Sequence, residues 1–258
     1  MAHTTSYRRI LHKMGYYDYQ QGLIYRHLNQ KNGWDSHLEH CRNFILKAID
    51  LINPEKITVY GSGWLLELPL AEMAERVKTI ILADIVHPPE VISQTAKLKN
   101  VKLVEEDVSG GLIEEVWKIA GKRTFLNKLT SLKEILIPEY QPVEDPGMVI
   151  SLNILTQLEV LPEKLLRKKT KASGDELTEF KREIQEKHIR FLKNYKSVLI
   201  TDFAEIFTDL KGAEVEQKTV VTTVPDGKVK EEWIWNFDLL YADYNKKRSV
   251  FKVVALIL

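Results

Sequence analysis

The chain has 258 residues, 44% hydrophobic and 28% charged, which is typical of an ordinary soluble globular protein long enough to bury a sizeable core. Its formal net charge of +1 excludes an overall electrostatic field that would steer it to nucleic acid or to an anionic membrane. The single cysteine, Cys41, excludes an intramolecular disulfide and favours a reducing compartment.

The N-terminal residues 1–19 lack the apolar core and the small-residue cleavage site of a secretory signal. No apolar run approaches the roughly 20 residues that a membrane-spanning helix needs. We therefore expect a cytoplasmic protein with no membrane partner.

Residues 1–53 are predicted to form an N-terminal helical cap. Within residues 36–52, apolar side chains repeat every three or four positions, as on one face of a helix, and Ser36 is the expected N-cap. The preceding stretch, residues 14–34, carries four of the ten tyrosines.

Residues 54–258 are predicted to form one α/β domain, because short apolar runs alternate with helix-like segments after Pro54. The runs that we assign to strands are residues 56–61, 78–86, 101–108 and 147–155. Alternating strands and helices indicate βαβ units, hence a parallel sheet with helices on both faces. Strands so uniformly apolar are expected to be buried on both sides.

The C-terminal third of the chain has a different pattern. Residues 162–196 are predicted to be helical, and residues 197–207 to form another buried strand. A Pro-Asp-Gly sequence at 225–227 predicts a hairpin within residues 217–237, and the chain ends on a strand at 248–258. Antiparallel strands should therefore join the parallel sheet late in the sequence.

The sequence KITVYGSGWLLELPL, residues 56–70, places two glycines where the first strand ends. We expect a helix to follow at once, so that its first backbone N–H groups point past the carboxyl edge of the sheet. Gly61 and Gly63 would let the backbone turn sharply and let a ligand approach closely. The alternative is a tight turn that binds nothing.

Acidic residues follow the next two strands. Asp84 comes about 20 residues after the glycines, where a carboxylate can accept hydrogen bonds from both hydroxyls of a ribose. Asp107 or Glu106 ends the third strand, in reach of an adenine amino group. Each acid alone could instead face solvent or cap a helix, but three such sites on successive strands favour a nucleoside ligand.

These motifs resemble those of the class I S-adenosylmethionine-dependent methyltransferases over residues 50–258. VYGSG is similar to the first family motif, ADI to the second, EEDV to the third, and VISLNILTQL to the strand beside the reacting methyl group. The resemblance implies a doubly wound, Rossmann-like mixed sheet of seven strands, parallel with a reversed edge strand. It also implies methyl transfer to a small-molecule acceptor.

The resemblance assigns S-adenosylmethionine as cofactor and implies a set of contact residues. By resemblance, Gly61, Ser62 and Gly63 would pass beneath the methionine portion. Asp84 would hold the ribose, and Asp107 with Val108 would flank the adenine. The complete implied set is Gly61, Ser62, Gly63, Asp84, Ile85, Asp107, Val108, Asn153 and Leu155.

Two residues are predicted to act on the acceptor. The Asn153 amide would orient the acceptor atom, although it could instead cap a helix beginning near Thr156. Tyr17 is the catalytic candidate from the cap, which could act as a lid whose tyrosines (Tyr16, Tyr17, Tyr19 and Tyr25) shape the acceptor pocket. These tyrosines could equally pack an extra helical layer.

The sequence departs from the family pattern at two positions, and two other functions stay open. Val59 stands where the family usually has an acid, and Leu65 where it has a third glycine. Val59 favours a non-catalytic, methyltransferase-like binding protein. An NAD-dependent oxidoreductase would use the same crevice, but Leu66 stands where its G-x-G-x-x-G motif needs a glycine.

Two further features favour structural roles. His37, His40 and Cys41 share a helical face with spacing compatible with a metal, but no second group of ligands accompanies them, so we predict no metal site. The basic residues 164–171, with Lys181, could meet phosphate, but such a run is usually a solvated helix face, so nucleic acid is not favoured. No oligomeric state follows from the sequence.

Overall fold

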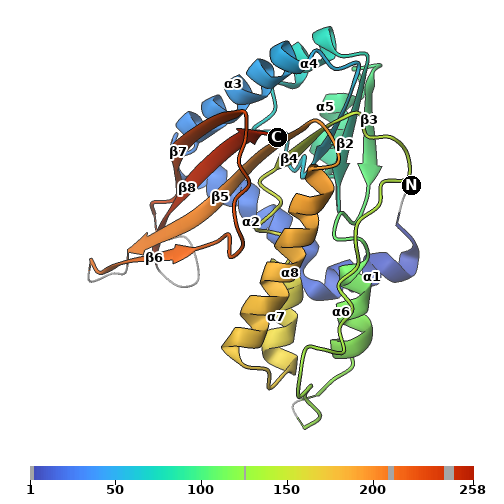
Figure 1. Ribbon diagram of the computed structural model, residues 1–258, viewed down its shortest axis with the longest axis vertical. Coiled ribbons are helices and arrows are strands. Elements are labelled where there is room, and N and C mark those ends of the chain that lie inside the picture. Colours follow the sequence, from blue (N-terminus) through green and yellow to red (C-terminus); the bar gives the residue numbers. More distant parts are fainter. Residues whose placement is uncertain (1–2, 125, 209–211, 241–246) are drawn as a thin grey trace.

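Residues 3–124, 126–208, 212–240 and 247–258 are described by the computed structural model, which Figure 1 shows as a ribbon. The helices are α1 (Thr5–Met14), α2 (Tyr16–Asn29), α3 (Asp35–Ile52), α4 (Leu70–Arg76), α5 (Pro89–Thr95), α6 (Leu112–Ala120), α7 (Val160–Lys169) and α8 (Gly174–Leu192). The strands are β1 (Lys56–Tyr60), β2 (Thr79–Asp84), β3 (Val101–Glu105), β4 (Met148–Leu152), β5 (Ser197–Thr208), β6 (Glu214–Lys218), β7 (Val229–Asp238) and β8 (Arg248–Ile257).

Seven of these strands form one continuous mixed sheet in the order β3-β2-β1-β4-β5-β8-β7. The pairs from β3 to β5 are parallel, whereas β8 runs antiparallel to both β5 and β7. The short strand β6 pairs with the outer half of β5 and lies off this path. The predicted doubly wound α/β fold with a reversed strand is confirmed, and the reversed strand lies one place in from the β7 edge.

Apolar side chains on both faces of the central strands explain why helices cover both sides. In β1, Val59 is fully buried in a core cluster with α3, α4 and α5, while Tyr60 is buried in a second cluster with α1, α6, α7 and α8. Successive residues of a strand point to opposite faces, so an uninterrupted apolar run requires two covered faces. Figure 1 shows α8 running downward from the central strands, with α7 and α6 near its lower half.

The helix α3 belongs to this core rather than to a separate cap. Its buried residues Leu38, Phe44 and Ile45 share one cluster with β1, β4 and β5. The boundary that the sequence suggested between a cap (residues 1–53) and an α/β domain (residues 54–258) therefore falls between α3 and the sheet against which α3 packs. The part of the N-terminus that lies over the carboxyl ends of the strands is the pair α1 and α2 (Figure 1).

Two sequence expectations about helix starts are wrong. No helix begins at Trp64, because residues 61–69 form turns and α4 starts at Leu70, directly after Pro69. A proline restricts the residue before it to extended backbone, which delays the helix. Ser36 lies inside α3 rather than at its N-cap, which is Trp34 without a side-chain hydrogen bond.

The expected hairpin within residues 217–237 is also wrong. Most of its first run, residues 219–224, is not a strand, and residues 217–218 end β6, which pairs with β5. Its second run, β7, pairs with β8. Alternating polarity identifies a half-buried strand but not its partner. The long helical stretch expected for residues 162–196 is two helices, and α8 begins with a capping box in which Ser173 and Glu176 bond each other's backbone N–H groups.

The buried His188 connects α8 to β4 and makes stability depend on pH. Its Nε2 lies 2.8 Å from the Ser151 hydroxyl, and burial lowers the pKa of His188 to about 4. The unfolded chain takes up this proton near pH 6.5 and the folded chain does not, so stability is lost as pH falls from 6.5 to 4. We expect His188 to reduce the free energy of unfolding by roughly 2–3 kcal/mol over that range.

Urea denaturation at pH 7 and pH 4.5 measures this effect, with His188→Gln as the control that cannot titrate. The buried Glu159 carboxyl, whose pKa burial raises to about 7, changes stability in the opposite direction, but equally in both proteins. The difference between the two proteins therefore isolates His188. Identical pH dependence in the two would contradict this assignment.

Candidate functional site

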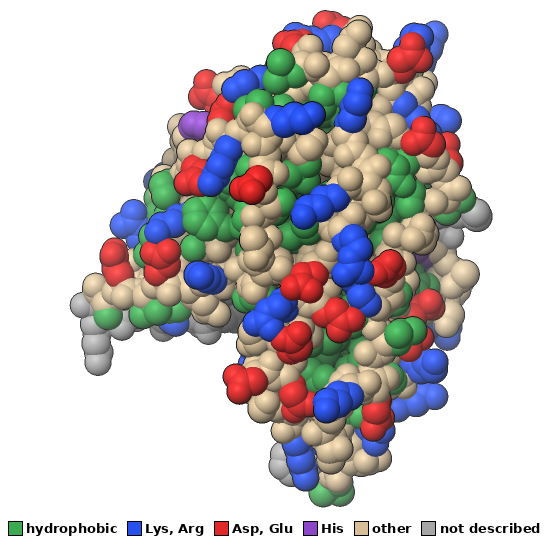
Figure 2. All heavy atoms as spheres, in the orientation of Figure 1, with side chains coloured by type: hydrophobic (Ala, Val, Ile, Leu, Met, Phe, Trp, Pro, Cys, Tyr) green, Lys and Arg blue, Asp and Glu red, His purple; other side chains and the backbone are tan. Residues whose placement is uncertain are grey.

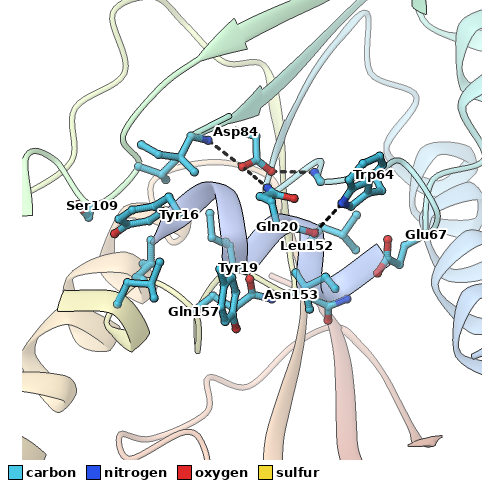
Figure 3. Close-up of a pocket in the computed structure, with 18 of the residues that line it drawn as sticks. Tyr16, Tyr19, Gln20, Trp64, Glu67, Asp84, Ser109, Leu152, Asn153 and Gln157 are labelled. Carbon is cyan, nitrogen blue, oxygen red and sulfur yellow. Dashed lines mark hydrogen bonds between the residues drawn. The ribbon is translucent and has the colours of Figure 1, made fainter. Parts of the chain in front are cut away.

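A cavity of about 130 Å³ lies where β1, β2 and β4 end, closed on one side by α2. Figure 3 shows α2 crossing it, with Asp84 on one side of the helix and Asn153 on the other. The carboxyl edge of parallel strands is the usual ligand site of an open α/β sheet. This volume is close to that of an engineered cavity known to hold one benzene ring, so a nucleoside needs α2 to move.

The glycine turn brings the backbones of two neighbouring strands into close contact. Gly61 has φ +82°, and a Cβ built on it would lie 2.5 Å from the backbone oxygen of Leu152 in β4. Gly63 has φ +50° and no such neighbour, so its surroundings are open. Both glycines line the cavity, whereas Ser62 between them is fully buried and does not.

Asp84 faces the glycine turn across the cavity (Figure 3). Its Oδ2 accepts a hydrogen bond of 2.7 Å from the Gly63 N–H, and its Oδ1 accepts one of 2.7 Å from the Ile85 N–H. Gln20 Nε2 of α2 donates to the same Oδ1 at 3.2 Å. Burial raises the pKa of the Asp84 carboxyl, and the Gly63 hydrogen bond is the largest effect opposing that rise.

The third strand ends in a second carboxylate that the N-terminal helices also contact. Asp107 accepts hydrogen bonds from the Ser109 N–H (2.9 Å), from the Ser109 hydroxyl and from the Tyr7 hydroxyl (2.9 Å) of α1. Burial raises the pKa of Asp107, and these hydrogen bonds oppose the rise. The helices α1 and α2 therefore hold both acids in the present arrangement.

The structure brings most of the predicted contact residues around one cavity. These are Gly61, Gly63, Asp84, Ile85, Asp107, Val108 and Asn153. These residues come together because each of them ends or closely follows one of four parallel strands, and the carboxyl ends of parallel strands lie at the same edge of the sheet.

Three predicted residues other than Ser62 lie elsewhere. Tyr17 does not line the cavity, and its ring lies 6.0 Å from that of His12. Leu155 is buried in the core, and Tyr25 is 57% exposed. On a helix, positions 16, 19, 20 and 23 share a face that 17 does not, so Tyr16, Tyr19, Gln20 and Leu23 line the cavity instead.

Asn153 lies at the centre of the cavity wall in a left-handed conformation, φ +50°. Its N–H donates to the Ile200 backbone oxygen at 2.8 Å, and its Nδ2 lies 3.4 Å from His37 Nε2. It does not cap a helix, because α7 begins only at Val160.

A cluster that sequence reasoning missed lies at one end of the cavity. Trp233 Nε1 donates to His37 Nδ1 at 3.0 Å, and Trp235 stacks on the His37 ring at 3.9 Å between centroids. Glu67 Oε1 lies 4.0 Å from His37 Nε2. Burial lowers the pKa of His37 to about 3, so the imidazole is neutral. The sequence signals were His37, noted above only for its spacing with His40 and Cys41, and Glu67, a single carboxylate within the apolar run WLLELPL.

The cluster does not have the form of a metal site. His40 turns its Nδ1 to the Ser36 backbone oxygen, at 2.6 Å, away from Cys41. Burial raises the pKa of the Cys41 thiol, which disfavours the thiolate that binds metals. In the ranges that the structure describes, no three His, Cys, Asp or Glu side chains come close enough to hold an ion.

Three of the basic residues in and near α7 are engaged within the protein. Arg167 pairs with Glu163, Lys169 Nζ donates to the Arg123 backbone oxygen at 2.6 Å, and Lys181 lies 3.1 Å from the buried Glu159. On the face shown in Figure 2, basic and acidic side chains are interspersed. Among the helices described, none is long and apolar enough to cross a membrane.

Comparison with known proteins finds similar structures but no similar sequences. No family model and no curated protein matches the sequence. The 1,6-didemethyltoxoflavin-N1-methyltransferase of Burkholderia thailandensis, solved with 1,6-didemethyltoxoflavin and S-adenosylhomocysteine, is 10% identical with a TM-score of 0.43, covering 100% of this chain and 92% of its own.

Two more methyltransferase-type structures are similar over most of the chain. DhpI in its SAH complex is 9% identical, with a TM-score of 0.38 and coverage of 96% of each chain. The methyltransferase domain of bacterial CtHen1 is also 9% identical, with a TM-score of 0.35 and coverage of 84% of this chain and 96% of its own. Scores this low do not establish a shared activity.

Proposed function

We propose that this chain binds S-adenosylmethionine and transfers its methyl group to a small-molecule acceptor. The observation that carries the proposal is the meeting of the glycine turn, Asp84 and Asp107 at the ends of three adjacent parallel strands around one cavity. The sheet order, with β8 reversed between β5 and β7, agrees with the family that the sequence motifs resemble.

The residues present fit this cofactor in type. Asp84 would accept hydrogen bonds from the ribose hydroxyls, Gly61 and Gly63 would leave room for the methionine portion, and Asp107 with Val108 would flank the adenine. The bound cofactor would supply an already activated methyl group. The protein then has mainly to align the acceptor with it and exclude water, so no nucleophilic side chain is required.

A non-catalytic binding protein is the second candidate, and Val59 favours it. The side chain is fully buried and apolar, so this position supplies no carboxylate for the cofactor ammonium group. An NAD-dependent oxidoreductase is less favoured, since the residues after Gly63 form turns and give no glycine-rich helix start.

Calorimetric titration with S-adenosylmethionine, S-adenosylhomocysteine and NAD separates these functions. Tight binding of S-adenosylhomocysteine is the result we expect for a methyltransferase. Binding of NAD alone would support the oxidoreductase. If none of the three binds, the non-catalytic alternative replaces the proposal.

This proposal requires α2 to move away from the cavity, because the Gln20 side chain is hydrogen-bonded to the Asp84 oxygen that the ribose would use. Replacing Gln20 by alanine should tighten binding of S-adenosylhomocysteine about 3- to 10-fold, since the ribose no longer competes with Gln20 Nε2 for Oδ1. Gln21→Ala, on the exposed side of the same helix, is the matched control and should bind like wild type. Unchanged or weaker binding by the Gln20 variant would show that α2 does not compete with the ligand.

A further inference from the structure

The end of the cavity farthest from Asp107 has aromatic walls and one carboxylate. Trp34, Trp64 and Trp235 line it, and Glu67 stands among them with its side chain 15% exposed. In Figure 3, Glu67 and Trp64 lie at the opposite end from Tyr16 and Ser109. A pocket with apolar walls and few polar groups favours a planar organic ligand, which those groups would orient.

The hydrogen bonds around His37 fix which of its nitrogens carries the proton. An indole N–H can only donate, so His37 Nδ1, which meets Trp233 Nε1 at 3.0 Å, must be an acceptor. A neutral imidazole then carries its hydrogen on Nε2, the atom that lies 4.0 Å from Glu67 Oε1. The protonated Nε2 of His37 therefore faces Glu67 from beyond hydrogen-bond distance, and His37 cannot take a proton from a ligand itself.

Asn153 adds a second donor beside this one. Its Nδ2 lies 3.4 Å from His37 Nε2, and the Asn153 side chain also donates a hydrogen bond to the Glu67 carboxyl. Burial raises the pKa of the Glu67 carboxyl, and hydrogen bonds from its own backbone and from Asn153 oppose the rise. A buried carboxyl group whose pKa is raised by an apolar wall is suited to accept a proton from a ligand and to hold it.

Three side chains that line the cavity carry buried polar atoms without a hydrogen-bond partner in the described parts of the chain. They are the acceptors Gln20 Oε1 and Asn153 Oδ1 and the donor Trp235 Nε1. Buried polar atoms in proteins are nearly always paired. Unpaired acceptors and an unpaired donor together match a ligand that has both an N–H or O–H group and an acceptor atom.

We propose that Glu67 is the proton acceptor of the reaction and that the methyl acceptor is a planar heterocycle with a ring N–H. This inference rests on the proposed methyl transfer. The ring nitrogen would form a bond to the methyl carbon as the carbon–sulfur bond breaks, leaving a thioether. The proton of the ring N–H would pass to a Glu67 oxygen, and the electron pair of the N–H bond would stay on the ring nitrogen. The negative carboxylate and the positive sulfonium would thereby both become neutral, so charge and atoms balance.

Benzimidazole is a suitable probe, because it is planar and has one ring N–H and one acceptor nitrogen. In protein saturated with S-adenosylhomocysteine, we expect it to bind wild type at least tenfold more tightly than 1-methylbenzimidazole, which lacks the N–H. In Glu67→Gln, which keeps one acceptor oxygen but loses the negative charge, this preference for benzimidazole should shrink, and in Glu67→Ala the two probes should bind alike. With S-adenosylmethionine and benzimidazole, product formation followed by mass spectrometry should fall at least 100-fold in Glu67→Gln.

The controls separate this inference from the proposed function. Glu67→Gln should bind S-adenosylhomocysteine like wild type, which also shows that it folds, and the exposed Glu72→Gln on α4 should behave like wild type throughout. If wild type binds S-adenosylhomocysteine but does not bind benzimidazole, or if Glu67→Gln methylates it at the wild-type rate, the inference is overturned. If wild type does not bind S-adenosylhomocysteine, the proposed function fails first, and the inference with it.

Discussion

Asp84→Ala is expected to weaken binding of S-adenosylhomocysteine by roughly 1–3 kcal/mol, about 5- to 150-fold. Two effects add in this variant. The ribose loses a buried carboxylate acceptor, and the Gly63 N–H loses the oxygen that holds it at 2.7 Å, so the glycine turn is no longer fixed. Calorimetric titration measures the change directly.

Two variants make this result specific. Asp84→Asn keeps the shape of the side chain and one acceptor oxygen, so its affinity should fall between those of wild type and Asp84→Ala. Asp50→Ala, at the far end of α3 in an exposed ion pair with Arg76, should leave affinity unchanged. An Asp84→Ala protein that binds with wild-type affinity would refute the assignment of Asp84 to the ribose.

Gly61→Ala should destabilise the protein by roughly 2–4 kcal/mol. Its φ of +82° costs an L-residue about 1–2 kcal/mol, and the new Cβ would lie 2.5 Å from the Leu152 backbone oxygen. This oxygen belongs to β4 and cannot turn away as a flexible side chain could. Relief of the contact requires the ends of β1 and β4 to separate, and urea denaturation would report the loss.

Gly63→Ala is the matched control for this prediction. It also has a positive φ, +50°, but its Cβ would meet nothing nearer than the Gly61 oxygen at 3.9 Å. We expect a stability loss of only about 1–2 kcal/mol, with weaker S-adenosylhomocysteine binding because the methyl group would occupy ligand space. Equal destabilisation by the two substitutions would contradict the close contact at Gly61.

Sequence patterns were sufficient for features that depend on local order. The apolar runs at 56–61 and 78–86 require a sheet covered on both faces, and a glycine turn or an acid directly after a strand must lie at its carboxyl edge. For this reason Gly61, Asp84, Asp107 and Asn153 could be predicted to line one crevice. The same reasoning failed for Tyr17, because the choice of helix face needs the exact start and packing of α2.

Partners that are distant in sequence could not be predicted in this way. The side-chain donor to Asp84 is Gln20, 64 residues away, and the ring nitrogen of His37 accepts from Trp233, 196 residues away. Such contacts depend on how α2 and β7 pack after the sheet has formed, which no local pattern encodes.

The sequence by itself determined the α/β sheet, its crevice and the acids at its edge, because strand order along the chain and alternation of side chains are local properties. The tertiary structure alone decided that β6 joins β5, that α2 closes over Asp84 and that Glu67 meets His37 and Asn153. The physical reason is that these arrangements are selected by burial and hydrogen bonding among surfaces that meet only in the folded chain.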